Sequence, residues 1–325
     1  VLSFCISQPG WSLDEDYTRG VRLEIERIED RLMEDIPPEE EAKLLWDLAT
    51  RSRLIGDTIR ARFALEQLRE SPAWSTFPSR LDALLQAALI EESQSRFGPA
   101  AEIYAQILDD ELPRPKELTL DSTYVGYALR WAECLERAGD SGRAAAVYWS
   151  LLDGLPESHQ MTVLFRLMRN YRYGQPSKED MERLAERVNA LSTGTLRWQL
   201  AQMYEGKGMH EKAADLFEEL WTELPAAAAS YMEEMLSAFH QTGRLEAFLE
   251  QAEARVTENI DRSAARFLAA AYQRLGDPQK TIEIITKCQA ATANQLMAQA
   301  ENLAPTASVP MPAEVHMLTP GLVEL

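Results

Sequence analysis

Apolar residues recur along this chain at helical spacing, and the predicted helices come in pairs. In the clearest pair, Leu200, Ala201 and Tyr204 lie on one face of a first helix. Gly208 then reverses the chain, and Pro225 prevents a second helix from continuing. No segment shows a convincing strand pattern. The sequence therefore predicts an all-α fold.

The second helix of this pair carries a small residue, Ala213, four positions before an aromatic one, Phe217. Ala201 and Ala213 allow the two helix backbones to approach closely, and the aromatic rings fill the space beside them. One such pair cannot bury its apolar face alone. Neighbouring pairs must therefore stack to form a continuous core.

The same order of small residue, turn, small residue and bulky residue recurs along the chain. The copies are marked by Ala49, Gly56, Ala61 and Leu65; Ala88, Phe97 to Pro99, Ala100 and Tyr104; Ala132, Gly139, Ala144 and Tyr148; Leu167, Gly174 and Ala185; Leu236, Gly243 and Ala247; Ala269, Gly276, Thr281 and Ile285. The copy at Gly174 has a proline inside its turn, and the copy at Gly243 is one residue short. With Gly208, these turns predict about seven helix pairs.

These positions resemble those of the tetratricopeptide repeat (TPR) family, whose unit is a helix-turn-helix of about 34 residues. The resemblance covers roughly residues 42 to 292. It implies a right-handed α-solenoid of about seven TPR-like helix pairs. It also implies a concave side made by the first helices, which acts as a docking surface and not as a catalyst.

The ends of the chain depart from the repeat. We expect the solenoid to occupy residues 20–292, with an amphipathic capping helix over 20–35 at its start. Residues 293–304 are predicted to form a last, separate helix. Residues 305–325 contain four prolines and are expected to be an extended or flexible tail. Between the second and third copies, residues 114–123 form an insertion.

Residues 1–19 bear on the compartment. A short apolar run is followed by Gly10 and Ser12 and then by acidic residues, as at the end of a secretory signal peptide, but no basic residues precede it. Two readings stay open. The protein is periplasmic or in the cell envelope if this segment is a truncated signal peptide, and cytoplasmic otherwise.

The charge of the chain excludes some partners. Its 33 basic and 52 acidic side chains give a formal net charge of −19, which repels nucleic acid and favours basic partners. No stretch approaches the ~20 apolar residues of a membrane span.

No pattern of catalytic or metal-binding residues is present. The three cysteines and four histidines are scattered, so neither a metal site nor a cofactor is predicted. The acidic clusters lack the spacing of a calcium loop, and no phosphate-binding or nucleophile motif occurs. We expect a protein that is not an enzyme.

The TPR resemblance assigns partner contacts to the first helices. The fifth place of each repeat holds, in order, Trp46, Leu85, Leu129, Leu164, Trp198, Glu233 and Arg266. Family members that bind chaperone tails carry a lysine and asparagine clamp, which this sequence lacks. Five of the seven residues are apolar, which suits an amphipathic helix or an extended apolar segment. Alternatively, these side chains pack between repeats or lie under the chain's own ends.

The sequence thus predicts a non-catalytic scaffold or adaptor that holds a protein or peptide partner on its concave face. An alternative is a structural or accessory subunit of a larger complex, envelope-associated in one version, whose catalysis lies in other chains. The identity of the partner and the oligomeric state are left open.

Overall fold

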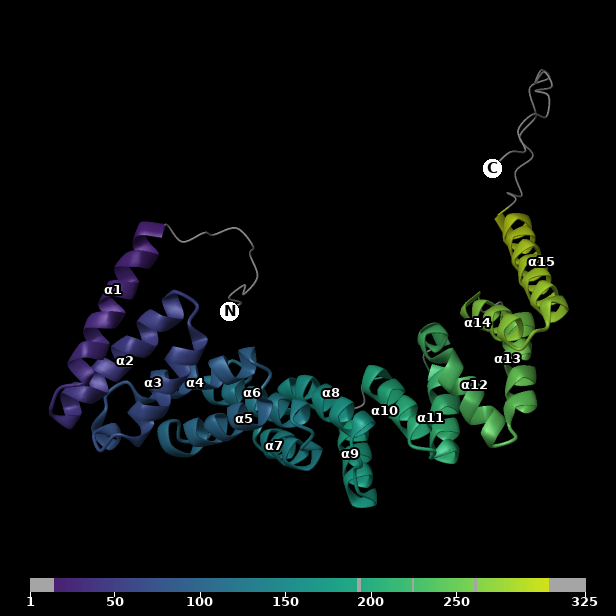
Figure 1. The fold of residues 1–325 in the computed structure, drawn as a ribbon. Coiled ribbons are helices and arrows are strands. Elements are labelled where there is room, and N and C mark those ends of the chain that lie inside the picture. Colours follow the sequence, from purple (N-terminus) through teal and green to yellow (C-terminus); the bar gives the residue numbers. More distant parts are fainter. Residues whose placement is uncertain (1–14, 192–193, 224, 260–261, 304–325) are drawn as a thin grey trace. The chain divides into compact units, whose positions relative to one another are not determined.

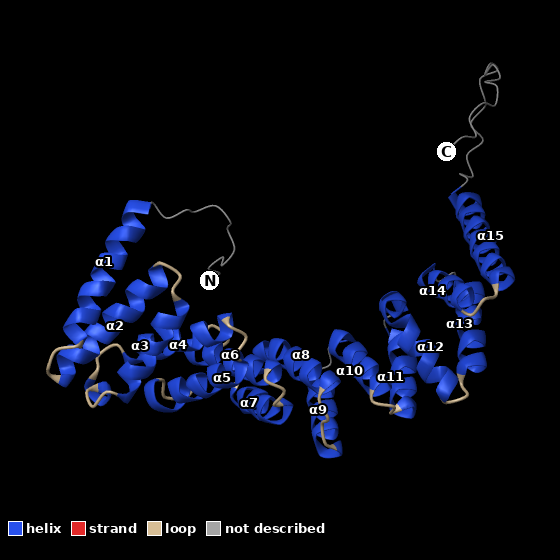
Figure 2. Ribbon diagram, in the orientation of Figure 1, coloured by secondary structure: helices blue, strands red, loops and turns tan. Residues whose placement is uncertain are grey.

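The computed structural model describes residues 15–191, 194–223, 225–259 and 262–303. Every regular element in these ranges is a helix (Figure 2). The α-helices are α1 (Glu15–Leu32), α2 (Pro38–Leu54), α3 (Thr58–Glu70), α4 (Arg80–Ser93), α5 (Phe97–Gln106), α6 (Thr123–Arg137), α7 (Ser141–Gly154), α8 (Glu157–Tyr173), α9 (Lys178–Leu191), α10 (Gly194–Gly206), α11 (His210–Glu223), α12 (Met232–Gln241), α13 (Leu245–Asn259), α14 (Arg262–Arg274) and α15 (Pro278–Leu303). Shorter helical segments are η1 (Trp74–Thr76), η2 (Ile107–Glu111) and η3 (Pro225–Tyr231). The predicted all-α class is confirmed.

The helices pack in series. In the first of two units, residues 1–203, each helix from α1 to α7 contacts the next one in the chain (Figure 1). In the second unit, residues 204–325, the same holds from α11 to α15. Serial packing of helix pairs is the solenoid arrangement that the repeats predict. In chain order, the helices from α2 to α15 number fourteen, as the seven predicted pairs require.

Five of the seven turns depend on a glycine with a left-handed backbone. These are Gly56, Gly139, Gly208, Gly243 and Gly276, with φ angles between 71° and 85°. At each turn the residue after the glycine donates its N–H to a carbonyl of the first helix, as Asp140 does to Leu135 at 2.9 Å. This hydrogen bond closes the helix end in the manner of a Schellman motif.

The prediction placed the second turn wrongly. It is made by Ser95, with a φ angle of 57°, and Phe97 already begins α5. Arg96 donates its N–H to the Glu91 carbonyl at 2.9 Å, the same bond that follows each turn glycine. The predicted turn residues Phe97 to Pro99 instead form the first turn of α5, because glycine and proline are tolerated there.

The sixth pair also differs from the prediction. Ala247 is exposed, and Phe248, five residues after Gly243, takes the buried place of the small residue. Phe248 stacks on Phe239 with 4.1 Å between ring centroids. An aromatic residue thus fills the space between helices that an alanine occupies elsewhere.

Most of the other marker residues form the core as predicted, but Ala185, Ala269 and Thr281 are only half-buried and Ile285 is exposed. Ala61, Ala144 and Ala213 are completely buried, and so are Tyr148 and Phe217. These side chains lie between the helices of a pair and against the next helix, which accounts for the regular sequence pattern.

The ends of the helical array differ in detail from the prediction. α1 begins at Glu15, five residues earlier than expected, with Glu15 and Asp16 in its first turn, where acidic side chains are favourable. The expected separate helix over 293–304 is the continuation of α15, because no glycine or proline interrupts the chain between Pro278 and Leu303. The expected signal-peptide remnant lies outside the described residues except for 15–19, and the tail at 305–325 lies entirely outside them.

Among the described residues, no helix combines the length and apolar character needed to cross a bilayer.

Candidate functional site

The seven residues predicted to contact a partner do not share one environment. Leu164 and Trp198 are core residues, only 0% and 1% exposed. The others are half-buried or exposed; they are Trp46, Leu85, Leu129, Glu233 and Arg266. Trp46 packs edge-on against Phe77, with 6.3 Å between ring centroids. A partner can therefore reach only part of the predicted apolar stripe.

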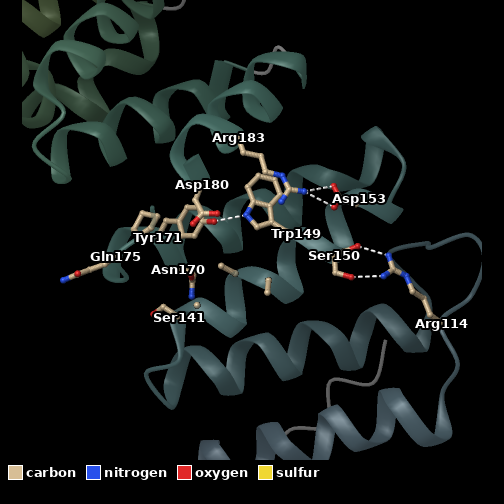
Figure 3. Close-up of a pocket in the computed structure, with 14 residues that line it drawn as sticks. Arg114, Ser141, Trp149, Ser150, Asp153, Asn170, Tyr171, Gln175, Asp180 and Arg183 are labelled. Atoms are coloured by element: carbon tan, nitrogen blue, oxygen red, sulfur yellow. Dashed lines mark hydrogen bonds and ion pairs between the residues drawn. The ribbon is translucent and has the colours of Figure 1, made fainter. Parts of the chain in front are cut away.

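A cleft of about 610 Å³ lies between α7 and α9 (Figure 3). Arg183 of α9 lies over the indole ring of Trp149, 4.0 Å from its centroid, and donates hydrogen bonds to Asp153. The Trp149 indole N–H donates to the Tyr171 hydroxyl at 2.8 Å. Arg114, from the insertion, donates to the Ser150 side chain and carbonyl. These groups pair with one another, so the cleft presents few free charges.

One polar residue in this cleft is an exception. Asn170 is 4% exposed, and neither atom of its side-chain amide has a hydrogen-bond partner among the described residues. Asn170 lies four residues before Gly174. In the pairs that turn at Gly208 and Gly276, the residue four positions before the glycine is a tyrosine, Tyr204 or Tyr272. The fourth pair therefore has a polar group where the repeat places an aromatic ring.

A different surface concentrates unbalanced charge. Five arginines, which we call the arginine face, line two adjoining depressions of about 460 and 290 Å³ on the first helices α6 and α8; they are Arg130, Arg137, Arg166, Arg169 and Arg172. Arg166 belongs to both depressions, so the two form one surface. On a chain of net charge −19, this grouping of positive charge is a local exception.

Three glutamates hold part of the arginine face in place. Glu133 lies 2.9 Å from Arg137 and 3.6 Å from Arg166, measured between charged nitrogen and oxygen atoms. Glu136 lies 2.8 Å from Arg169. The guanidinium of Arg130 lies 3.3 Å from a Glu92 oxygen.

The arginines outnumber these glutamates and keep solvent-exposed donors. Arg130, Arg137 and Arg169 each have about half of the side chain exposed, at 49%, 53% and 51%. A guanidinium has five N–H donors, so a single carboxylate leaves several of them available for a ligand. The glutamates therefore orient the arginines without neutralising the surface.

Apolar side chains accompany the arginines. Leu129, one of the predicted contact residues, lines the depression around Arg130, and Phe165 and Met168 line the other one. This mixture suits a peptide segment that carries both acidic and apolar side chains.

The titratable groups nearest this surface are poor nucleophiles. Burial, together with the charges of Glu92 and Glu133, raises the pKa of the Cys134 thiol to about 12. Burial and a hydrogen bond to Glu92 also raise the pKa of Tyr104. Both groups therefore stay protonated near neutral pH.

The arginine face was not predicted, although its signal is present in the sequence. Arg130 and Arg137 are seven residues apart, and Arg166, Arg169 and Arg172 are spaced by three, which places each set on one helix face. The excess of acidic residues over the whole chain concealed this local grouping.

No protein-family model matches the sequence. No curated protein matches it. Among solved structures, the chain is similar to a tetratricopeptide repeat protein from Parabacteroides merdae at 13% sequence identity and a TM-score of 0.40, over 80% of this chain and 97% of that one. The description of the fold therefore depends on the helices and turns of this chain itself.

Proposed function

We propose that the chain is a non-catalytic, TPR-type scaffold that holds a partner protein, and that the arginine face binds an acidic segment of this partner. The observation that carries the proposal is the grouping of five arginines on the first helices α6 and α8. Clusters of arginine recognise carboxylates through paired, charge-assisted hydrogen bonds. This proposal replaces the basic partner that the net charge alone favoured.

The neighbouring apolar residues set the second requirement for the partner. Leu129 and Phe165 lie beside the arginines and offer contact to apolar side chains. An acidic segment with interspersed leucine or phenylalanine residues would use both kinds of contact. Trp46 and Leu85, which the TPR resemblance assigns to partner contacts, are also proposed to touch the partner.

The test measures binding of a fluorescein-labelled peptide of alternating glutamate and leucine to the full chain by fluorescence anisotropy. The variant R166Q/R169Q removes two charges, and loss of two charge-assisted hydrogen bonds weakens binding by about tenfold or more. The control variant is R143Q, which removes an exposed, ion-paired arginine from the second helix α7. Binding to R143Q is expected to match that of the unmodified chain.

Two results would refute the proposal. One is equal binding of a peptide in which lysine replaces every glutamate. The other is tighter binding of a single-stranded oligonucleotide, which would assign the arginine face to nucleic acid. Circular dichroism of both variants checks that their helices are intact.

A further inference from the structure

The last helix, α15, exposes a side chain that the other second helices bury. Leu65, Tyr104, Tyr148 and Phe217 each lie nine residues after the residue that makes their turn, and each is at most 1% exposed. Ile285 lies nine residues after Gly276 and is 44% exposed. Among the described residues, the last repeat therefore leaves its core position only partly covered.

The reason is the absence of a following helix among the described residues. α3, α5, α7 and α11 each contact the helix that comes next in the chain, and α15 ends the described array. Beside Ile285 lies a groove of about 690 Å³ between α14 and α15. Ala265, Ala269 and Ala293 also line it, and their small side chains leave room for a helix backbone to approach.

The charge of this groove is opposite to that of the chain. Arg262 and Arg266, one helical turn apart, line it, and no acidic residue does. Neither arginine forms an ion pair with any described residue, whereas many other arginines of the chain do. Positive charge beside an apolar floor favours a ligand with carboxylates along one edge of an apolar face.

We propose that the groove between α14 and α15 binds an amphipathic helix of a partner protein in the position that a further repeat helix would occupy. Its apolar face would cover Ile285, Ala265 and Ala269, and its aspartate or glutamate side chains would face Arg262 and Arg266. This site is separate from the arginine face and does not depend on the function proposed for it.

Residues 304–325 are a poorer candidate for this place on sequence grounds. Residues 304–325 contain Pro305, Pro310, Pro312 and Pro320, and proline interrupts a helix. A second copy of the chain is also a poorer candidate, because two chains of net charge −19 repel each other. An external helix is therefore the occupant that fits best.

Cys288 lines the groove and serves as a reporter in the full chain. In a C5S background, an alkylating reagent at pH 8 should modify Cys288 and spare Cys134, whose thiol has a pKa raised to about 12 by burial. The probe is a synthetic amphipathic helix of about 18 residues with a leucine stripe flanked by glutamates. A matched peptide carries lysine in place of every glutamate.

The proposal predicts that the glutamate peptide slows alkylation of Cys288 and that the lysine peptide does not. The variant R262E/R266E should bind the glutamate peptide at least tenfold more weakly and gain affinity for the lysine peptide. The control R274E, which changes an exposed arginine of α14 outside the groove, should bind as the unmodified chain does. If R262E/R266E loses binding of the glutamate peptide and R166Q/R169Q retains it, this site is separate from the arginine face.

Three outcomes would overturn the proposal. Equal protection by both peptides would show that charge does not select the ligand. Slow alkylation of the free chain that speeds up on dilution would show that a second copy fills the groove. Slow alkylation at every dilution would assign it to residues 304–325.

Discussion

Leu118 occupies the space in which a side chain at position 154 would stand. An ideal Cβ on Gly154 would lie 2.6 Å from Leu118 Cδ1 and 2.8 Å from Arg114 Nη2. Leu118 is itself 2% exposed, so the insertion between η2 and α6 is packed against the end of α7. Gly154 is therefore needed for close approach of the insertion.

The first prediction follows from this contact. G154A should lower the free energy of unfolding by about 1 to 3 kcal/mol, because the added methyl group forces Leu118 or the chain around it to move. G142A is the control, since the nearest atom to its Cβ would be 4.0 Å away. That change should stabilise α7 by up to about 1 kcal/mol, as expected for alanine in place of glycine in a helix. Urea denaturation of both variants measures the difference, and equal effects would contradict the contact.

The second prediction concerns Ser95, the non-glycine turn residue. A left-handed backbone costs a serine roughly 1 to 2 kcal/mol relative to glycine, so S95G should raise the free energy of unfolding by about 0.5 to 1 kcal/mol. G208A makes the opposite change at an equivalent turn, where φ is 73°, and should destabilise the chain by about 1 kcal/mol. Thermal unfolding checks both signs. A destabilising S95G would mean that the serine side chain contributes more than the backbone conformation does.

Local rules made most of the fold predictable from the sequence. A glycine, a small residue five positions on and a bulky residue four further on mark a helix pair unambiguously at Gly139 and Gly208. Two of the errors came from places where another residue type meets the same backbone or packing need. Ser95 adopts the glycine conformation, and Phe248 takes an alanine position. The five-residue spacing between turn and buried residue identifies both. Counting back five positions from Ala100 gives the turn at Ser95, and counting forward five from Gly243 gives Phe248.

The candidate sites were less predictable because exposure depends on neighbours that sequence does not specify. Leu164 and Trp198 hold the same repeat place as Leu129, yet only the last reaches a surface depression. Similarly, Ile285 has the sequence character of a core residue, and it is exposed because α15 has no described follower. Arg266 was singled out by its repeat place, and the structure puts it in the α14–α15 groove.

The third prediction compares two buried side-chain amides. Gln160, 3% exposed, donates to the carbonyls of Leu152 and Leu155 at 3.1 and 2.8 Å, whereas the Asn170 amide has no hydrogen-bond partner within the described part of the chain. Q160L should therefore destabilise the chain by about 1 to 3 kcal/mol, because it leaves buried acceptors unpaired. N170L should stabilise it by a similar amount, because it removes an unpaired buried amide.

Denaturation of both variants under the same conditions gives the comparison. A destabilising N170L would show that the Asn170 amide is hydrogen-bonded in solution, by ordered water or by a molecule in the α7–α9 cleft. Equilibrium dialysis of the purified chain against small molecules extracted from it would then distinguish a bound molecule from ordered water.

The last prediction concerns alkaline pH. Burial raises the pKa of Tyr171 from its usual 10 to about 12. Between these values the unfolded chain has released this proton and the folded chain still holds it, so the unfolded state binds fewer protons and the free energy of unfolding falls as pH rises. The stabilisation from this group is complete below pH 10 and is lost by about pH 12.

The Y171F variant isolates this effect from that of the other tyrosines. It lacks the titrating hydroxyl, so its free energy of unfolding should fall less steeply than that of the unmodified chain from pH 10 to 12. It should also start lower at pH 8, because the Trp149 indole N–H loses its acceptor. Y173F, which changes a tyrosine that is 82% exposed, is the matched control and should leave the slope unchanged. Parallel curves for Y171F and the unmodified chain would mean that Tyr171 ionises as readily in the folded state as in the unfolded one, and that the hydroxyl is open to solvent.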